Sequence, residues 1–300
     1  MMDALEMSDA VEAALNERIA EIYAGALKKA VKKAASFLKK VKAVDDGRIT
    51  PPQYYVDTDT VDKWRKGYLD ELVRQYNVID GIMDELNRAG VDAAALIRDT
   101  MPEIYAINER ETIQKLTPSV RNAGLDGTLE KHTKKQIAVI LQKEESPFSK
   151  IAYRNLGQNA AVRRRLQNEL AQATALGESQ AQLIKRIMAV TGQAQYQAKR
   201  VAQTERTRVQ SQARWERGNE AAQIGVRVYN TWSTRMVNSR DTHIALNGRS
   251  AMQGEPFPGS ILRYPGDPRA PAGEVINCHC VLVPDVLMDG QEIIDGQVVG

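Results

Sequence analysis

The spacing of apolar residues changes at Gly225, and this change constrains the fold more than any other feature of the chain. Before Gly225, apolar side chains recur every three or four residues, which is the period of an amphipathic helix. After it, Val226 and Val228 alternate with polar neighbours, which is the period of a strand. The sequence therefore predicts an α+β fold. A mainly helical N-terminal region precedes a small α+β C-terminal domain that has a long helix, a short sheet and a large loop.

Glycines and prolines divide the helical part of the chain into segments. The spacing predicts helices over residues 3–44, 60–88, 91–116, 128–143, 150–176, 180–190 and 194–224. We expect Asp59 to cap the second of these helices, Gly90 to end it, Pro102 to kink the third, and Thr191-Gly192 to end the sixth. The break at Ser146-Pro147 is the predicted domain boundary.

Three regions follow from that boundary. Residues 1–147 are a helical arm suited to docking onto a partner, residues 148–284 are a domain that begins with basic helices, and residues 285–300 are a C-terminal tail. Within the second region, we expect a strand near 226–232 and a closing strand over 274–284. Residues 240–273 between them are rich in glycine and proline, which predicts a long loop.

Composition limits the class of protein. The chain has 300 residues, a net charge of +3 and two cysteines, and these cysteines are separated by one residue. Such a pair does not make a disulfide framework, which fits a reducing compartment. No apolar run approaches the ~20 residues that span a bilayer, and the N-terminus lacks the order of a signal peptide. We expect a soluble protein without a membrane partner, made in a cytoplasm.

Positive charge is concentrated in two stretches. Residues 27–44 contain seven lysines and no acid, namely Lys28, Lys29, Lys32, Lys33, Lys39, Lys40 and Lys42. Residues 151–220 contain twelve Lys or Arg against five acids. Either stretch is a solvated helix face or a contact to phosphate, and the first could also lie on a membrane surface. The candidate DNA contacts in the second stretch are Arg163, Arg164, Arg165, Lys199, Arg200, Arg206 and Arg208.

Reactive side chains gather near the C-terminus, in Arg240-Asp-Thr-His243 and Asn277-Cys-His-Cys280. His243 with Arg240 could act as a general base on a phosphate substrate. His243, Cys278 and Cys280 could instead bind zinc, because alternate residues of a strand face the same side. In a purely structural interpretation, both cysteines are small buried residues and no cofactor is present. A cysteine nucleophile is a further alternative.

The order of these pieces resembles the phage Mu protein F-like head morphogenesis proteins, a family of minor head or minor capsid proteins. The likeness covers roughly residues 195–284. It depends on these residues: Thr204, Glu205, Trp232, Arg240, His243, Gly248, Pro265, Gly266, Asp267, Pro268, Asn277, Cys278 and Cys280. The chain departs from the family pattern at Gln203 and His279, where arginine is usual, and at Val237-Asn238, where acids are common.

The resemblance implies a protein of the virion, inside the capsid of a tailed phage, that is assembled in the host cytoplasm and acts in head morphogenesis. Its partners would be the portal protein and packaged double-stranded DNA, with scaffold or major capsid protein as further candidates. Residues 1–147 would then be the portal-docking arm. A structural protein without catalytic activity is the expectation, and DNA packaging and ejection are the processes in which it would take part. An enzyme that acts on nucleotide or nucleic-acid phosphates through His243, and a zinc-stabilised interaction module, are the alternatives.

Overall fold

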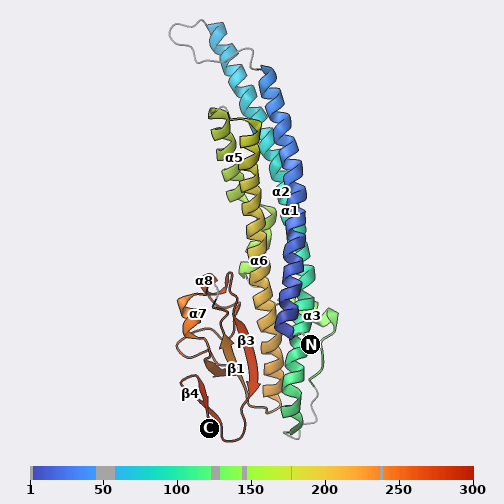
Figure 1. Cartoon of the computed structure of the whole chain (residues 1–300), viewed down its shortest axis with the longest axis vertical. Helices are drawn as coiled ribbons and strands as arrows, with labels where there is room; N and C mark the ends of the chain where they lie inside the picture. Colours follow the sequence, from blue (N-terminus) through green and yellow to red (C-terminus); the bar gives the residue numbers. More distant parts are fainter. Residues whose placement is uncertain (1–2, 45–57, 123–128, 144–146, 177, 237–238) are drawn as a thin grey trace. The chain divides into compact units, whose positions relative to one another are not determined.

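The computed structural model describes residues 3–44, 58–122, 129–143, 147–176, 178–236 and 239–300, except for the side chains of residues 36–76, 148, 174, 175 and 180. Its elements are α1 (Ala4–Val44), α2 (Thr58–Asn122), α3 (Lys134–Lys143), α4 (Pro147–Gly157), α5 (Ala160–Ala175), α6 (Gln180–Gln223), β1 (Val228–Ser233), α7 (Asp241–Ala245), β2 (Ser250–Met252), α8 (Ala272–Val275), β3 (Val281–Val286), β4 (Glu292–Ile294) and β5 (Gln297–Val299) (Figure 1). Helices come first and the short antiparallel strands last, which confirms the predicted α+β class.

The described chain packs into two compact units that do not follow chain order. The first combines Met1–Arg18, Ala95–Tyr153 and Lys199–Gly300, and the second combines Ile19–Ala94 and Arg154–Ala198. Helices α1, α2 and α6 contribute residues to both units. The functional boundary at 147 that the sequence suggests stays a prediction.

Three helices begin at a capping box, in which a side chain before the helix and one in its first turn each accept the other's backbone N–H. The pairs are Asp3 with Glu6, Thr133 with Gln136, and Ser179 with Gln182. These bonds satisfy N–H groups that the first turn of a helix leaves without partners. The pair at Thr133 explains why α3 begins at Lys134, six residues after the start predicted from apolar spacing.

Helix α2 is continuous where the sequence predicted two helices. It begins at Thr58, so Asp59 lies in the first turn and is not the cap, and it runs without a break through Gly90 and Pro102. A Cβ at Gly90 would lie 1.7 Å from the carbonyl oxygen of Leu156 in α4. Gly90 therefore allows two helices to approach closely and does not end a helix.

Helix α6 also joins two predicted helices. It passes through Thr191 and Gly192, where the Thr191 hydroxyl donates a 2.9 Å hydrogen bond to the Ile187 carbonyl. A glycine inside a helix costs only about 1 kcal/mol relative to alanine, which a helix of this length tolerates. Gly225, by contrast, has a φ of +97° and lies two residues after the end of α6 at Gln223, close to the end that the sequence predicted.

The predicted helix over 150–176 is two helices. Helix α4 ends at Gly157 and α5 begins at Ala160. The Asn159 side chain causes the second start, because its Oδ1 accepts a 3.0 Å hydrogen bond from the Val162 N–H.

The C-terminal sheet has the strand order β2-β1-β3, and both pairings are antiparallel. Figure 1 shows β1 and β3 beside the C-terminal part of α6, and the Arg214 guanidinium of α6 donates a 2.8 Å hydrogen bond to the Leu282 carbonyl of β3. Val228, Asn230 and Trp232 of β1 are buried and alternate with less buried residues, which confirms the period-two pattern. The core beside the sheet includes Trp232, Phe257 and Leu282.

Two expectations for the C-terminal part, the loop and the closing strand, were wrong in detail, and the tail has regular structure of its own. The predicted loop over 240–273 contains α7, β2 and the start of α8. The closing strand begins only at Val281, because Asn277 adopts a φ of +57° that interrupts an extended chain. The predicted tail forms the hairpin β4–β5, and the Ser250 N–H of β2 donates a 2.8 Å hydrogen bond to the Gly296 carbonyl in its turn.

Candidate functional site

The middle of α6 is buried although its side chains are polar. Arg206 is 1% exposed and forms ion pairs with Asp9 and Glu12 of α1. Arg208 is 3% exposed, and its Nη2 lies 2.8 Å from Glu205 Oε2. Buried charges require such partners, because desolvation is costly. Arg206 and Arg208 therefore form ion pairs inside the fold, and their role as DNA contacts stays a prediction that this burial does not favour.

The other candidate DNA contacts are more accessible. Arg164 and Arg200 are exposed, and Lys199 is half-buried. Arg163 forms an ion pair with Asp80, and Arg165 Nη1 donates a 2.6 Å hydrogen bond to Gln193. These five residues stay predictions as DNA contacts.

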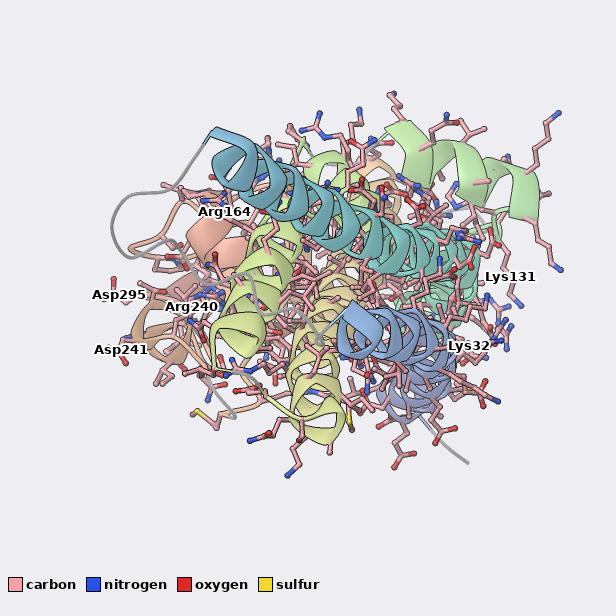
Figure 2. The ribbon with its side chains drawn as sticks, turned by 90° about the horizontal axis from the view of Figure 1, so that it is seen from above. Lys32, Lys131, Arg164, Arg240, Asp241 and Asp295 are labelled. Atoms are coloured by element: carbon pink, nitrogen blue, oxygen red, sulfur yellow. The ribbon has the colours of Figure 1, made fainter. Side chains whose placement is uncertain are left out.

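A basic segment at α3 was missed by sequence reasoning. Its exposed lysines are Lys131, Lys134, Lys135 and Lys143, and no acid lies among residues 131–143. Figure 2 shows Lys131 projecting outward from its ribbon. The absence of acids over thirteen residues is the signal that could have identified the segment.

The lysine-rich stretch of α1 divides into described and undescribed parts. Lys28 and Lys32 are exposed, whereas Lys29 and Lys33 lie 3.6 and 3.1 Å from Glu85 carboxylate oxygens. The side chains of Lys39, Lys40 and Lys42 lie outside the described residues. Glu85 thus neutralises part of this positive charge within the fold. This agrees with a solvated helix face and does not require a contact to phosphate.

Helix α6 holds the turn that carries the two cysteines. The Thr207 hydroxyl and the Gln203 amide both donate hydrogen bonds to the Cys278 carbonyl, at 2.5 and 3.1 Å. The Thr204 hydroxyl accepts the Asn277 N–H at 2.9 Å. Thr204, which belongs to the family motif, and Gln203, which stands where the family usually has arginine, therefore both have a structural role. They fix the backbone from which the cysteines project.

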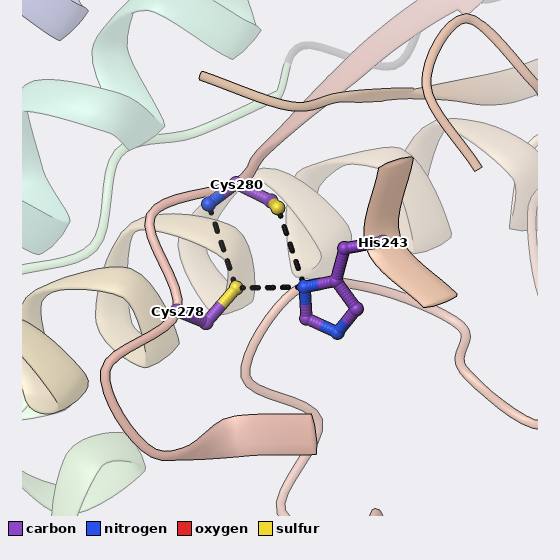
Figure 3. Close-up of side chains that lie close together, drawn as sticks. All are labelled: His243, Cys278 and Cys280. Carbon is purple, nitrogen blue, oxygen red and sulfur yellow. Dashed lines mark hydrogen bonds between the residues drawn. The ribbon is translucent and has the colours of Figure 1, made fainter. Parts of the chain in front are cut away.

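His243 meets both cysteines in the interior. The ring comes from α7, and its Nδ1 lies 3.5 Å from Cys278 Sγ and 3.4 Å from Cys280 Sγ (Figure 3). The three side chains are 1 to 3% exposed. Trp232 packs against the His243 ring in an edge-to-face arrangement, with 5.0 Å between ring centroids. The cysteines lie in a turn and not in the predicted strand, yet both sulfurs face the same imidazole.

The two thiols have opposite pKa shifts. The pKa of Cys280 is lowered to about 5, first by its hydrogen bond with Cys278 and then by His243. The same coupling to Cys280, together with burial, raises the pKa of Cys278 well above its usual value. The hydrogen bond between the two thiols and the neighbouring His243 ring thus favour the thiolate form of Cys280.

Glu274 of α8 completes the surroundings of His243. Its Oε2 lies 2.9 Å from His243 Nε2, although the ring N–H is not aligned for a hydrogen bond. The Thr242 hydroxyl donates a 3.0 Å hydrogen bond to the same carboxylate oxygen. The sequence spacing gave no sign of this contact, because His243 and Glu274 are 31 positions apart. It depends on how α7 and α8 pack together.

The catalytic hypothesis gains no support from this geometry. His243 is buried between two sulfurs and a carboxylate. Arg240 lies beside Asp241 at the start of α7, and its guanidinium donates to the Ile276 carbonyl (Figure 2). Arg240 is half-buried, but His243 presents no free face to a phosphate in solution, so acid–base work by this histidine would require the region to open.

The Pro265–Pro268 motif packs against α6. A Cβ at Gly266 would lie 2.8 Å from Arg208 Cα, and the residue has a φ of +78°. Asp267 is buried and accepts hydrogen bonds from the side chains of Arg263 and Arg269. Tyr264 stacks at 5.0 Å on Trp215 of α6. These contacts make the motif a packing element.

Residues 164–283 match the family model described as Phage Mu protein F like protein. Over this segment the chain is similar to the phage Mu protein F-like family, which supports the resemblance found in the sequence. The family points to phage head morphogenesis and to a component of the virion, and its members are in general structural proteins. No curated protein and no solved structure matches the chain. Among the described helices, none is long and apolar enough to cross a membrane.

Proposed function

We propose that this chain is a minor head protein of a tailed phage or prophage, located inside the capsid, that acts in head morphogenesis. In that role it binds the portal protein and packaged double-stranded DNA. It thereby takes part in DNA packaging and ejection, and contacts with scaffold or major capsid protein belong to the same assembly. The match of residues 164–283 to the Mu F-like family carries the proposal.

Exposed cations support the DNA half of this function. Arg164 on α5 and Arg200 on α6 lie on exposed positions, and the four lysines at 131–143 form a segment without acids. Clustered cations bind DNA by releasing the counterions condensed on its phosphates, which requires no particular base sequence. We therefore expect binding that depends strongly on salt and weakly on DNA sequence.

Fluorescence anisotropy with a labelled duplex of random sequence tests this expectation. The full chain is titrated between about 50 and 200 mM salt, and the logarithm of the binding constant should fall linearly with that of the salt concentration. Neutralising one phosphate contact should reduce the slope by about 0.9. The variants are Arg164→Gln and Arg200→Gln. Arg227→Gln is the control, because it removes one exposed charge outside the candidate set.

Absence of binding at the lowest salt would remove the DNA half of the proposal. A slope that changes as much in the Arg227→Gln control as in the other variants would show that the candidate residues are not the contacts. The portal half is tested by co-sedimentation with the portal ring of the same phage. A chain that stays in the supernatant while the ring sediments contradicts it.

A further inference from the structure

The side chains of His243, Cys278 and Cys280 form a compact set of metal donors. One ring nitrogen and two sulfurs lie within 4.8 Å of one another, although α7 and the cysteine turn are 35 residues apart in the chain (Figure 3). Nitrogen and thiolate sulfur are the donors that zinc prefers, whereas magnesium and calcium prefer oxygen. The chemistry of the set therefore selects a soft or borderline divalent ion.

The distances match those around a tetrahedral ion. With Zn–S near 2.3 Å and Zn–N near 2.0 Å, a tetrahedral angle places nitrogen and sulfur about 3.5 Å apart. The observed separations between His243 Nδ1 and the two sulfurs are 3.5 and 3.4 Å. Both nitrogen–sulfur separations therefore suit a shared tetrahedral ion, and all three donor atoms lie within 4.8 Å of one another.

The surroundings hold these donors in place. The Thr234 hydroxyl donates a 2.8 Å hydrogen bond to the His243 carbonyl, and α6 grips the Cys278 carbonyl through Thr207 and Gln203. Glu274 stands at the far nitrogen of the ring, 2.9 Å from Nε2. A carboxylate that accepts the other ring N–H is the usual outer partner of a zinc-bound histidine. Glu274 is near enough for that role, and a small rotation that aligns the ring N–H would complete it.

Charge balance favours the same ion. Two thiolates and a neutral imidazole carry two negative charges, which one Zn²⁺ cancels, and a neutral complex avoids the cost of burying net charge. Binding would release the two thiol protons to solvent. Within the described part of the chain, no fourth His, Cys, Asp or Glu belongs to the cluster. Water or another small ligand would take the fourth position.

We propose that His243, Cys278 and Cys280 bind one zinc ion that ties α7 to the turn before β3. This site is independent of the proposed role in the phage head, so either proposal can fail while the other stands. The ion would act on structure, because it joins two segments that the fold otherwise connects through hydrogen bonds.

The test uses the full chain, purified under reducing conditions with zinc in the medium. Elemental analysis should find close to one zinc per chain, and Cys280→Ser should reduce this by at least half. His279→Asn is the matched control, because it changes a half-buried residue between the two cysteines that lies outside the donor set. It should keep a full equivalent. Loss of zinc from His279→Asn with retention in Cys280→Ser would overturn the assignment.

A second measurement covers the case in which Cys280→Ser does not fold. The wild-type chain, stripped by a chelator and refilled with cobalt, should develop the absorption of thiolate-bound cobalt and saturate at one equivalent. Zinc should also raise the thermal midpoint of the stripped chain and slow alkylation of both thiols. A wild-type chain that contains no zinc, shows no cobalt–thiolate absorption and is alkylated equally fast with and without zinc would refute the site.

Discussion

Replacing Gly266 by alanine tests whether the most distinctive motif of the Mu F-like domain is a packing element. Gly266 has a φ of +78°, and a Cβ there would lie 2.8 Å from Arg208 Cα and 3.0 Å from its nitrogen. Gly259 lies in the same loop region with a φ of +73°, but nothing comes within 4 Å of a Cβ there. The two positions share the backbone conformation and differ in what surrounds them.

The expected cost follows from this difference. A left-handed conformation costs a residue with a Cβ about 1–2 kcal/mol, and both variants bear that cost. Carbon atoms pack near 3.5 Å, so at position 266 the loop must also move away from α6 by roughly 0.7 Å. Overpacking of this kind costs about 1–3 kcal/mol. We therefore expect Gly266→Ala to lower the free energy of unfolding by about 2–5 kcal/mol and Gly259→Ala by about 1–2 kcal/mol.

Thermal unfolding followed by circular dichroism measures both variants. For a chain of this size, 1 kcal/mol corresponds to a shift of about 2–4 °C in the midpoint, so the two variants should differ by several degrees. Zinc concentration is held constant, since any ion bound only by the folded chain raises the midpoint. Equal shifts for Gly266→Ala and Gly259→Ala would refute the argument, because contact with α6 would then contribute nothing to the need for glycine.

Two further predictions concern the second compact unit. Gly90→Ala should destabilise the chain by at least 1–3 kcal/mol, roughly the cost of overpacking, because its Cβ would meet the Leu156 carbonyl at 1.7 Å. Gly192→Ala is the control, because nothing lies within 4 Å of a Cβ at that position. It should stabilise the chain by about 1 kcal/mol in urea unfolding, since alanine favours a helix more than glycine does. A Gly90→Ala chain as stable as wild type would contradict the close approach of α2 and α4. The hydrogen bond from Lys33 lowers the pKa of Glu85 in the folded chain, so Glu85 contributes stability that is present above its unfolded pKa and lost as the pH falls through the folded one. The stability difference between wild type and Glu85→Gln should therefore be largest near neutral pH and disappear as the pH falls through the lowered folded pKa of Glu85. A pH-independent difference would count against the ion pair.

Local signals in the sequence predicted much of the fold. Helix starts at Ser179 and the stop at Gly225 depend on hydrogen bonds and dihedral angles of a few adjacent residues, which the sequence displays directly. Gly90 and Gly192 could not be interpreted in that way. A glycine inside a helix has the same local signature whether it ends the helix, permits a close contact or is merely tolerated. Only the position of Leu156 in space decides the case at Gly90.

The donor atoms of the candidate metal site could be predicted from the sequence, but the residues that hold the donors in place could not. The sequence identifies the three donors because soft metals bind mainly to cysteine and histidine, and the chain has only two cysteines and three histidines. These donors are His243, Cys278 and Cys280. The residues that surround these donors could not be predicted in the same way, because the contact of Glu274 with the His243 ring joins segments that are distant in the sequence. The same limit applies to Gln203, which substitutes for a usual arginine and yet binds the Cys278 carbonyl.

The basic character of α6 shows why a count of charges misleads about DNA contacts. Four of the twelve cations between 151 and 220 are buried arginines, at 206, 208, 214 and 217. Three of these four pair with acids outside that stretch: Arg206 with Asp9, Arg214 with Glu111, and Arg217 with Glu109. Their partners come from α1 and α2, so acids that the count leaves out neutralise part of the local excess of positive charge. The proposed contacts to phosphate would then come from the exposed cations of α3, α5 and the exposed positions of α6. A substitution of a buried arginine of α6 is expected to change DNA binding only by destabilising the fold.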